Sequence, residues 1–150
     1  MNTIETGTEE LLCRLEDRVA IITLKRPKKK NALSDHLTPA LRQTLLDLET
    51  KREVGCILIT GSGDAFCAGG DVKGFASGAA GGGLPPSQEE RIAGLRGGFE
   101  VSKLLHEIAK PTLAAIPGAA AGAGLSMALA CDLRVALSSA KSVSYTHLTL

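Results

Sequence analysis

Two glycine-rich turns, each placed directly after a short apolar run, constrain this chain more than any other feature of its sequence. The first run, Cys56–Thr60, leads into a turn that extends from Gly61 to Asp71. The second, Thr112–Ile116, leads into Pro117–Gly124. Short continuous apolar runs of this kind are typical of strands covered on both faces. Because glycine lets the backbone approach a ligand and N–H groups ahead of a helix attract negative charge, the two turns can share one oxyanion. The alternative is that their glycines serve only tight turns and close helix packing.

The first part of the chain predicts two strands and a helix. Leu11–Leu15 and Val19–Leu24 are apolar runs separated by three charged residues, which predicts a hairpin. A helix follows, with leucines at helical spacing at positions 37, 41, 45 and 48. Its start is open between Ser34 as the cap and Thr38 as the cap with Pro39 at the first helical position.

The second part repeats this order. A helix is predicted over Gln88–Ala109, weakened or kinked at Gly97-Gly98. The apolar residues expected on one face of it are Ile92, Leu95, Phe99, Leu105 and Ile108. After the second turn we expect a helix from about Gly122 to Ala130 and a strand at Leu133–Ala136. Alternating strands and helices predict an α/β fold with its site at the strand-to-helix turns.

Composition excludes several classes of function. The 150 residues, 44% of them hydrophobic, are enough for one domain with a sizeable core but not for two. A formal net charge of +1 and an aromatic content of 3% argue against a nucleic-acid partner. No stretch approaches the roughly 20 apolar residues of a membrane span. The polar, acidic N-terminal stretch does not resemble a signal peptide, so we expect a cytoplasmic protein without a membrane partner.

Metal, redox and nucleotide motifs are absent from the sequence. The cysteines at positions 13, 56, 67 and 131 form no C-x-x-C pair, which predicts buried free thiols, and the histidines are too dispersed for a metal cluster. Gly61–Phe66 breaks the G-x-G-x-x-G pattern at its last position, and no Gly-Lys pair is present for a P-loop. We therefore expect neither a metal site nor hydrolysis of a nucleoside triphosphate.

Several linked segments carry a resemblance to a known family: Asn31–Leu33, Ile57–Gly61, Ala65–Lys73, Lys110–Gly124 and Cys131–Arg134. In this order and spacing they resemble the crotonase, or enoyl-CoA hydratase/isomerase, family over about Val19–Lys141. The resemblance implies the crotonase-like spiral of repeated strand–strand–helix units, which is related to the fold of Clp protease. It also implies acyl-CoA thioester substrates, with coenzyme A as part of the substrate and no separate cofactor, and assembly as a homotrimer or homohexamer.

The same resemblance implies roles for residues in the two turns. Two backbone N–H groups hold the thioester oxygen in this family while an enolate develops, and by motif position they belong to Gly70 and Ala123. Ala68 and Val72 lie where family members offer backbone carbonyls to the adenine. Asp71 is expected to order the loop rather than to catalyse. The cations that could attract coenzyme A phosphates are Lys25, Arg26 and Lys28–Lys30.

One position departs from the hydratase pattern. Hydratases of the family carry a glutamate on the helix after the second turn, and the matching position here is Ser126. The second acid/base position of the family lies beyond Lys141, so no general base is assigned. A serine cannot act as the carboxylate base, and this favours isomerase-type enolate chemistry over hydration. Ser126 is then a substrate contact or an inert substitution.

Two alternatives to this enzyme remain open. Gly124–Ala128 approximates the G-x-S-x-G nucleophile elbow and resembles the serine region of Clp-type proteases, which predicts a serine hydrolase that uses Ser126. The only histidine downstream of that serine is His147. The other alternative is a non-catalytic relative that binds acyl-CoA.

The last eight residues, Val143–Leu150, resemble the translated end of a transposon adapter used for sequencing libraries. We therefore expect residues 1–142 to be the N-terminal part of an acyl-CoA-binding domain and 143–150 to be a non-native tail. We expect such a piece to be inactive, because family members continue with helices that complete the acyl pocket. We also expect it to be poorly soluble, because apolar surface meant for burial is exposed. The alternative is a natural C-terminal strand, since valine, tyrosine and threonine favour extended structure.

Overall fold

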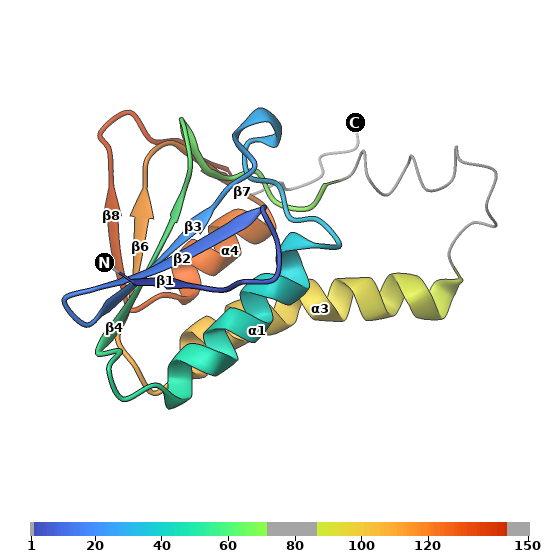
Figure 1. Cartoon of the computed structure of the whole chain (residues 1–150). Helices are drawn as coiled ribbons and strands as arrows, with labels where there is room; N and C mark the ends of the chain where they lie inside the picture. The colour runs from blue at the N-terminus through green and yellow to red at the C-terminus, as the bar shows by residue number, and fades with distance from the viewer. Residues whose placement is uncertain (1, 72–86, 144–150) are drawn as a thin grey trace.

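Strands and helices follow one another along the chain, and the strands form two separate sheets (Figure 1). The structure is a computed structural model that describes residues 2–71 and 87–143. Its elements are β1 (Asn2–Ile4), β2 (Leu11–Glu16), β3 (Val19–Leu24), the 3-10 helix η1 (Pro27–Lys29), α1 (Leu37–Thr50), β4 (Cys56–Gly61), β5 (Ala65–Cys67), α3 (Gln88–Glu107), β6 (Thr112–Ile116), β7 (Ala119–Ala121), α4 (Ala123–Ala130), β8 (Leu133–Ala136) and β9 (Ser142–Val143).

The topology repeats one unit. The larger sheet has the order β1-β2-β3-β4-β6-β8, and the smaller sheet has the order β5-β7-β9. Strands β3, β4, β6 and β8 pair in parallel, whereas β1 and β2 are antiparallel additions at one edge. The chain passes from a long strand in the larger sheet to a short strand in the smaller one and then to a helix, as in β4-β5-α3 and β6-β7-α4. This is the expected spiral of strand–strand–helix units.

The hairpin and the first helix are where the sequence predicts them. Strands β2 and β3 pair up to Glu16 and Val19, and the two residues between them, Asp17 and Arg18, both have the positive φ that a tight hairpin turn requires. On α1, the buried leucines are the predicted ones at positions 37, 41, 45 and 48. They face the larger sheet, and α3 packs beside α1 (Figure 1).

The structure decides where α1 begins. The helix starts at Leu37, so Pro39 lies inside its first turn and the alternative with Thr38 as the cap is wrong. The Ser34 hydroxyl oxygen accepts the backbone N–H of Leu37 at 3.0 Å. The residue at the cap position is His36, so neither predicted cap lies there, but Ser34 still satisfies one of the N–H groups at the helix start that have no partner within the helix.

The predicted face of α3 is wrong in part: Leu105 is buried and Ile108 packs against the core, but Ile92 and Phe99 do not lie on that face, and the side chain of Leu95 is outside the described part of the structure. Phe99 is 73% exposed and Ile92 is 42% exposed, whereas Val101 and Leu105 are buried. At about 3.6 residues per turn, positions 99 and 105 lie on different faces, while positions 101 and 105 lie on the same face. The helix is continuous across Gly97-Gly98.

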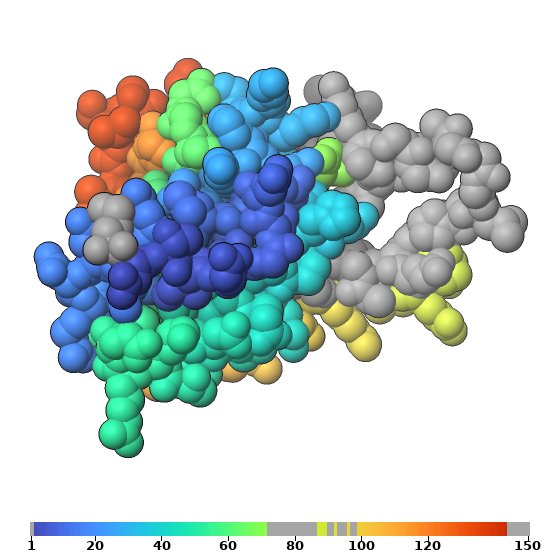
Figure 2. Space-filling view, viewed as in Figure 1, coloured from blue at the N-terminus to red at the C-terminus, as the bar shows by residue number. Residues whose placement is uncertain are grey.

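Burial of the other elements is uneven. Strands β4 and β6 alternate between buried and half-buried residues, so their second face is only partly covered. The edge strand β8 is exposed along its length, with Leu133 and Val135 each 61% exposed; it is coloured orange-red in Figure 2. All four cysteines are free thiols, and three of them are buried. In the described part of the chain, no helix is long and apolar enough to cross a membrane.

Candidate functional site

The first glycine-rich turn holds Gly70 in a defined orientation. Gly70 forms an isolated parallel bridge with Leu33, in which the Leu33 N–H donates to the Gly69 carbonyl at 2.7 Å and the Asp71 N–H donates to the Leu33 carbonyl at 2.9 Å. In a parallel bridge of this type, the central residue directs its own N–H away from the partner. The N–H of Gly70, an exposed residue, therefore points away from Leu33.

The second turn ends in the first residue of α4. Gly122 precedes this helix with φ 52° and ψ −125°, a conformation that glycine adopts without steric cost. The first helical hydrogen bond of α4 runs from the Ser126 N–H to the Gly122 carbonyl at 3.0 Å. Within α4, the N–H groups of Ala123, Gly124 and Leu125 thus have no helical acceptor. The half-buried Ala123 is the first of them.

The two turns are in direct contact. A Cβ placed on Gly69 would lie 3.0 Å from the carbonyl oxygen of Ala121 and 3.4 Å from the backbone nitrogen of Ala123. A Cβ on Gly124 would lie 2.3 Å from the carbonyl oxygen of Cys67. The absence of side chains at these glycines therefore brings the backbone beside Gly70 against the start of α4.

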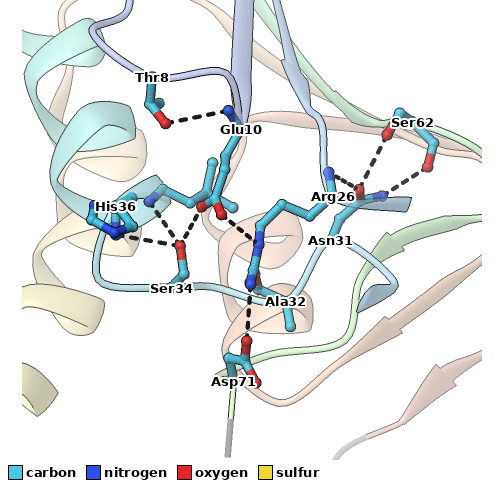
Figure 3. A network of polar contacts seen from close by, with 10 residues as sticks. Thr8, Glu10, Arg26, Asn31, Ala32, Ser34, His36, Ser62 and Asp71 are labelled. Atoms are coloured by element: carbon cyan, nitrogen blue, oxygen red, sulfur yellow. Dashed lines mark hydrogen bonds and ion pairs between the residues drawn. The ribbon is translucent and has the colours of Figure 1, made fainter. Parts of the chain in front are cut away.

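A cluster of ion pairs supports the first turn (Figure 3). The Arg26 guanidinium contacts the Glu10 carboxylate through Nε at 3.0 Å and the Asp71 carboxylate through Nη2 at 2.9 Å, and Nη1 donates to the Ala32 carbonyl. The Ser34 hydroxyl donates to the other oxygen of Glu10. A pocket of about 180 Å³ lies beside this cluster. Asp71 is thus tied to Arg26, which agrees with the expected role in ordering the loop, and the Arg26 charge is already balanced by two carboxylates.

Asn31 is a positioning residue whose role the sequence did not reveal. It is fully buried, with φ +56°. Its Nδ2 donates to the carbonyls of Ser62 at 2.9 Å and Ala65 at 2.8 Å, and its Oδ1 accepts the N–H of Arg26 at 2.9 Å. One amide side chain thereby fixes the segment after β3 against the turn after β4. The signal available was an asparagine directly after a run of lysines, a residue type that tolerates a left-handed backbone.

The other expected ligand-binding positions are more open. Ala68 is exposed, and its N–H donates to the Lys30 carbonyl at 3.0 Å. Lys25 is exposed, whereas the Lys30 ammonium contacts Asp64 at 2.6 Å. The hydrogen bond from Lys30 holds the pKa of the Asp64 carboxyl below its usual range. Val72 lies outside the described residues.

Ser126 is exposed on α4, one turn after Gly122. Its hydroxyl donates to the Gly122 carbonyl at 3.3 Å. The hydrogen bonds of residues 2–71 and 87–143 bring no basic side chain to this hydroxyl, and His147 lies outside the described residues. Those same residues contain no group of three or more metal-ligating side chains.

A comparison with protein families covers most of the chain. The model described as Enoyl-CoA hydratase/isomerase matches residues 14–148. The chain belongs to the enoyl-CoA hydratase/isomerase family. This confirms the resemblance carried by the two turns and their flanking strands.

Individual relatives within the enoyl-CoA hydratase/isomerase family agree. A Mycobacterium tuberculosis protein named "Probable enoyl-CoA hydratase EchA14" is 37% identical over 128 residues, 85% of this chain and 47% of that protein. The 4-chlorobenzoyl coenzyme A dehalogenase-1 of an Arthrobacter species is 41% identical over 121 residues, 79% of this chain and 42% of that protein. The crystal structure of an enoyl-CoA hydratase/isomerase from Xanthobacter autotrophicus Py2 superimposes with a TM-score of 0.84 at 27% identity, over 91% of this chain and 49% of that one. The chain spans about half the length of the relatives it matches.

Proposed function

We propose that this chain is the part of an acyl-CoA-transforming enzyme that binds the thioester oxygen between the backbone N–H groups of Gly70 and Ala123. The observation that carries the proposal is the contact between the two turns, in which Gly69 packs against Ala121 and Ala123. Each turn supplies one N–H that its own element does not use. Two such donors side by side form an oxyanion hole.

The chemistry follows from where negative charge develops. When a proton leaves the carbon next to a thioester carbonyl, the charge moves to the carbonyl oxygen. Preorganised N–H groups stabilise that charge without having to reorient, and this effect is among the largest that enzymes use. The N-terminal end of α4, which begins at Ala123, adds the positive end of a helix dipole.

Within this family we propose isomerase-type chemistry rather than hydration. Ser126 stands where hydratases have their first glutamate, and its hydroxyl bonds to the Gly122 carbonyl. A serine side chain does not take up the proton of an attacking water at neutral pH. A single carboxylate supplied from beyond Lys141 suffices to move a proton between two carbons of an enolate.

The remaining parts of the proposal concern substrate contacts and assembly. The Ala68 carbonyl and Val72 would face the adenine of coenzyme A, and the exposed Lys25 would attract its phosphates. Coenzyme A enters as part of the substrate, with no separate cofactor. We also propose a cytoplasmic homotrimer or homohexamer for the whole protein, and no activity for the 150-residue chain by itself.

The experiment compares this chain with the longest reading frame that contains it. Both proteins are incubated in D2O with 3-butenoyl-CoA and with crotonyl-CoA, and the products are followed by mass spectrometry. Isomerisation interconverts the two thioesters, which are separated by chromatography, and exchanges protons for deuterium without adding a solvent molecule, whereas hydration adds the mass of one D2O. We expect the longer protein to isomerise and the short chain to be inactive.

Three results would contradict this assignment. A dominant hydrated product from the longer protein would make the enzyme a hydratase. Binding of both thioesters without any conversion would indicate the non-catalytic relative. Labelling by a fluorophosphonate probe that disappears in Ser126→Ala would indicate the serine hydrolase.

A further inference from the structure

Arg26 joins three segments that are far apart in the sequence. Its side chain, 14% exposed, contacts Glu10 before β2, Ala32 ahead of α1, and Asp71 after the first glycine-rich turn. Figure 3 shows the guanidinium between these partners. The planar guanidinium carries donors in several directions, so one residue satisfies all three acceptors.

Two of these partners flank the bridge that orients Gly70. Ala32 precedes Leu33, and Asp71 follows Gly70. Leu33 and Gly70 are held in register by hydrogen bonds of 2.7 and 2.9 Å to the neighbours of Gly70. Arg26 therefore connects both sides of the bridge from outside, through the Ala32 carbonyl on one side and the Asp71 carboxylate on the other.

The carboxylates of Glu10 and Asp71 need the positive charge of Arg26. The Asp71 side chain is 15% exposed and that of Glu10 is 28% exposed, so both are partly withdrawn from water. Without the cation between them, two negative groups would face each other in a poorly solvated place. Loss of the Arg26 contact would therefore weaken the hold on Asp71, and with it on the backbone of the neighbouring Gly70.

We infer that Arg26 is a positioning residue that sets the direction of the Gly70 N–H toward the thioester oxygen, rather than a cation that binds coenzyme A phosphates. This inference rests on the proposed function of Gly70. The carboxylates of Glu10 and Asp71 already neutralise the Arg26 charge, whereas the neighbouring Lys25 is exposed. A lysine at position 26 would keep the charge but could not reach three acceptors in fixed directions.

The test measures the polarisation of a bound thioester. Butyryl-CoA labelled with ¹³C at the carbonyl is bound to the protein encoded by the longest reading frame, and the infrared frequency of its carbonyl is compared with that of the free thioester. Two N–H donors lower this frequency. We expect Arg26→Gln and Arg26→Lys to lose most of the shift with little change in Kd. Arg42→Gln serves as the control, because it removes an arginine from an exposed ion pair with Glu100 and leaves the shift intact.

A second thioester separates the two roles of Arg26. Butyryl-pantetheine lacks the nucleotide phosphates, so loss of the shift with both thioesters supports positioning. If Arg26→Gln keeps the shift with butyryl-CoA but weakens its binding, and binds butyryl-pantetheine normally, Arg26 is a phosphate contact and the inference is wrong.

A second variant covers the case in which Arg26→Gln fails to fold. Asp71→Asn breaks the same ion pair and is expected to lose the shift; retention of the shift in this variant overturns the inference. If the wild-type longer protein shows no shift, the oxyanion site itself is refuted, whereas a shift present in the wild type and equal in the variants refutes only the role of Arg26.

Discussion

Gly69 packs against the first residue of α4, and a Cβ on Gly69 would lie 3.4 Å from the backbone nitrogen of Ala123. The φ of Gly69 is +93°, so a side chain there is strained as well as crowded. Because these two backbones are packed together, the main chain itself brings the two N–H groups proposed to bind the thioester close to each other. Substitutions that alter the main chain at this contact should therefore affect activity most.

Replacement of Ala123 by proline tests one N–H directly. Proline is favoured at the first position of a helix, where the missing N–H has no helical acceptor, so α4 should persist. We expect the rate of thioester isomerisation by the longest reading frame to fall by a factor of about 10²–10³, as for loss of one oxyanion-hole donor. The matched control is Ala123→Ser, which keeps the N–H and should retain the rate. Full activity of Ala123→Pro in a folded protein would remove Ala123 from the site.

Gly124 tests the packing of α4 on β5. A Cβ at this position would lie 2.3 Å from the Cys67 carbonyl oxygen, and backbone cannot yield as a flexible side chain can. We expect Gly124→Ala to lower the free energy of unfolding by about 1–3 kcal/mol through overpacking, measured as the midpoint in urea. Gly55→Ala is the control, since its Cβ would meet only the side chain of Arg18 at 3.3 Å. Equal stability of the two variants would show that β5 and α4 are not in close contact.

The elements predicted from the sequence are those with a local signal. The leucine face of α1 follows from helical spacing alone, and the glycine-rich turns follow from residue type. The strands β5 and β7 have no such signal, because each is only three residues long and β7 consists of alanine alone; they form strands by pairing in the smaller sheet. On α3 the prediction fails at Ile92 and Phe99, because helical geometry places Phe99 on a different side from Leu105.

The candidate site also combines residues with a local sequence signal and residues without one. Motif positions point to Gly70 and Ala123, and the structure places their turns in contact. In the sequence, in contrast, Arg26 is only one cation in a basic run. Its partners Glu10 and Asp71 lie 16 and 45 residues away along the chain, and no local pattern pairs them. The distinction between a phosphate-binding cation and a buried ion pair needs the tertiary structure.

Asn31 is expected to contribute more to stability than a surface amide. Asn31→Ala leaves the carbonyls of Ser62 and Ala65 without their donor and places alanine at φ +56°. At about 1–3 kcal/mol for each unsatisfied buried group, we expect a loss of roughly 3 kcal/mol or more in the free energy of unfolding. Gln43→Ala, which removes an exposed amide bonded to Asp47, should stay within about 0.5 kcal/mol. A small effect of Asn31→Ala in urea unfolding would mean that water replaces these bonds.

Burial of three thiols predicts a loss of stability at alkaline pH. Burial raises the pKa of Cys13, Cys67 and Cys131 from 9.0 to about 11. Between these two values the unfolded chain loses its thiol protons while the folded chain keeps them, so the folded state binds more protons and its stability falls as pH rises. Below pH 9 the thiols are protonated in both states and their contribution to stability is fully present. Above pH 9, each thiol lowers the free energy of unfolding by at most about 1.4 kcal/mol per pH unit. Urea unfolding at pH 9, 10 and 11 should therefore show a steeper decline for the wild type than for Cys67→Ala, which lacks one of the three thiols. Identical slopes for the two proteins would show that Cys67 ionises in the folded state as readily as in the unfolded chain.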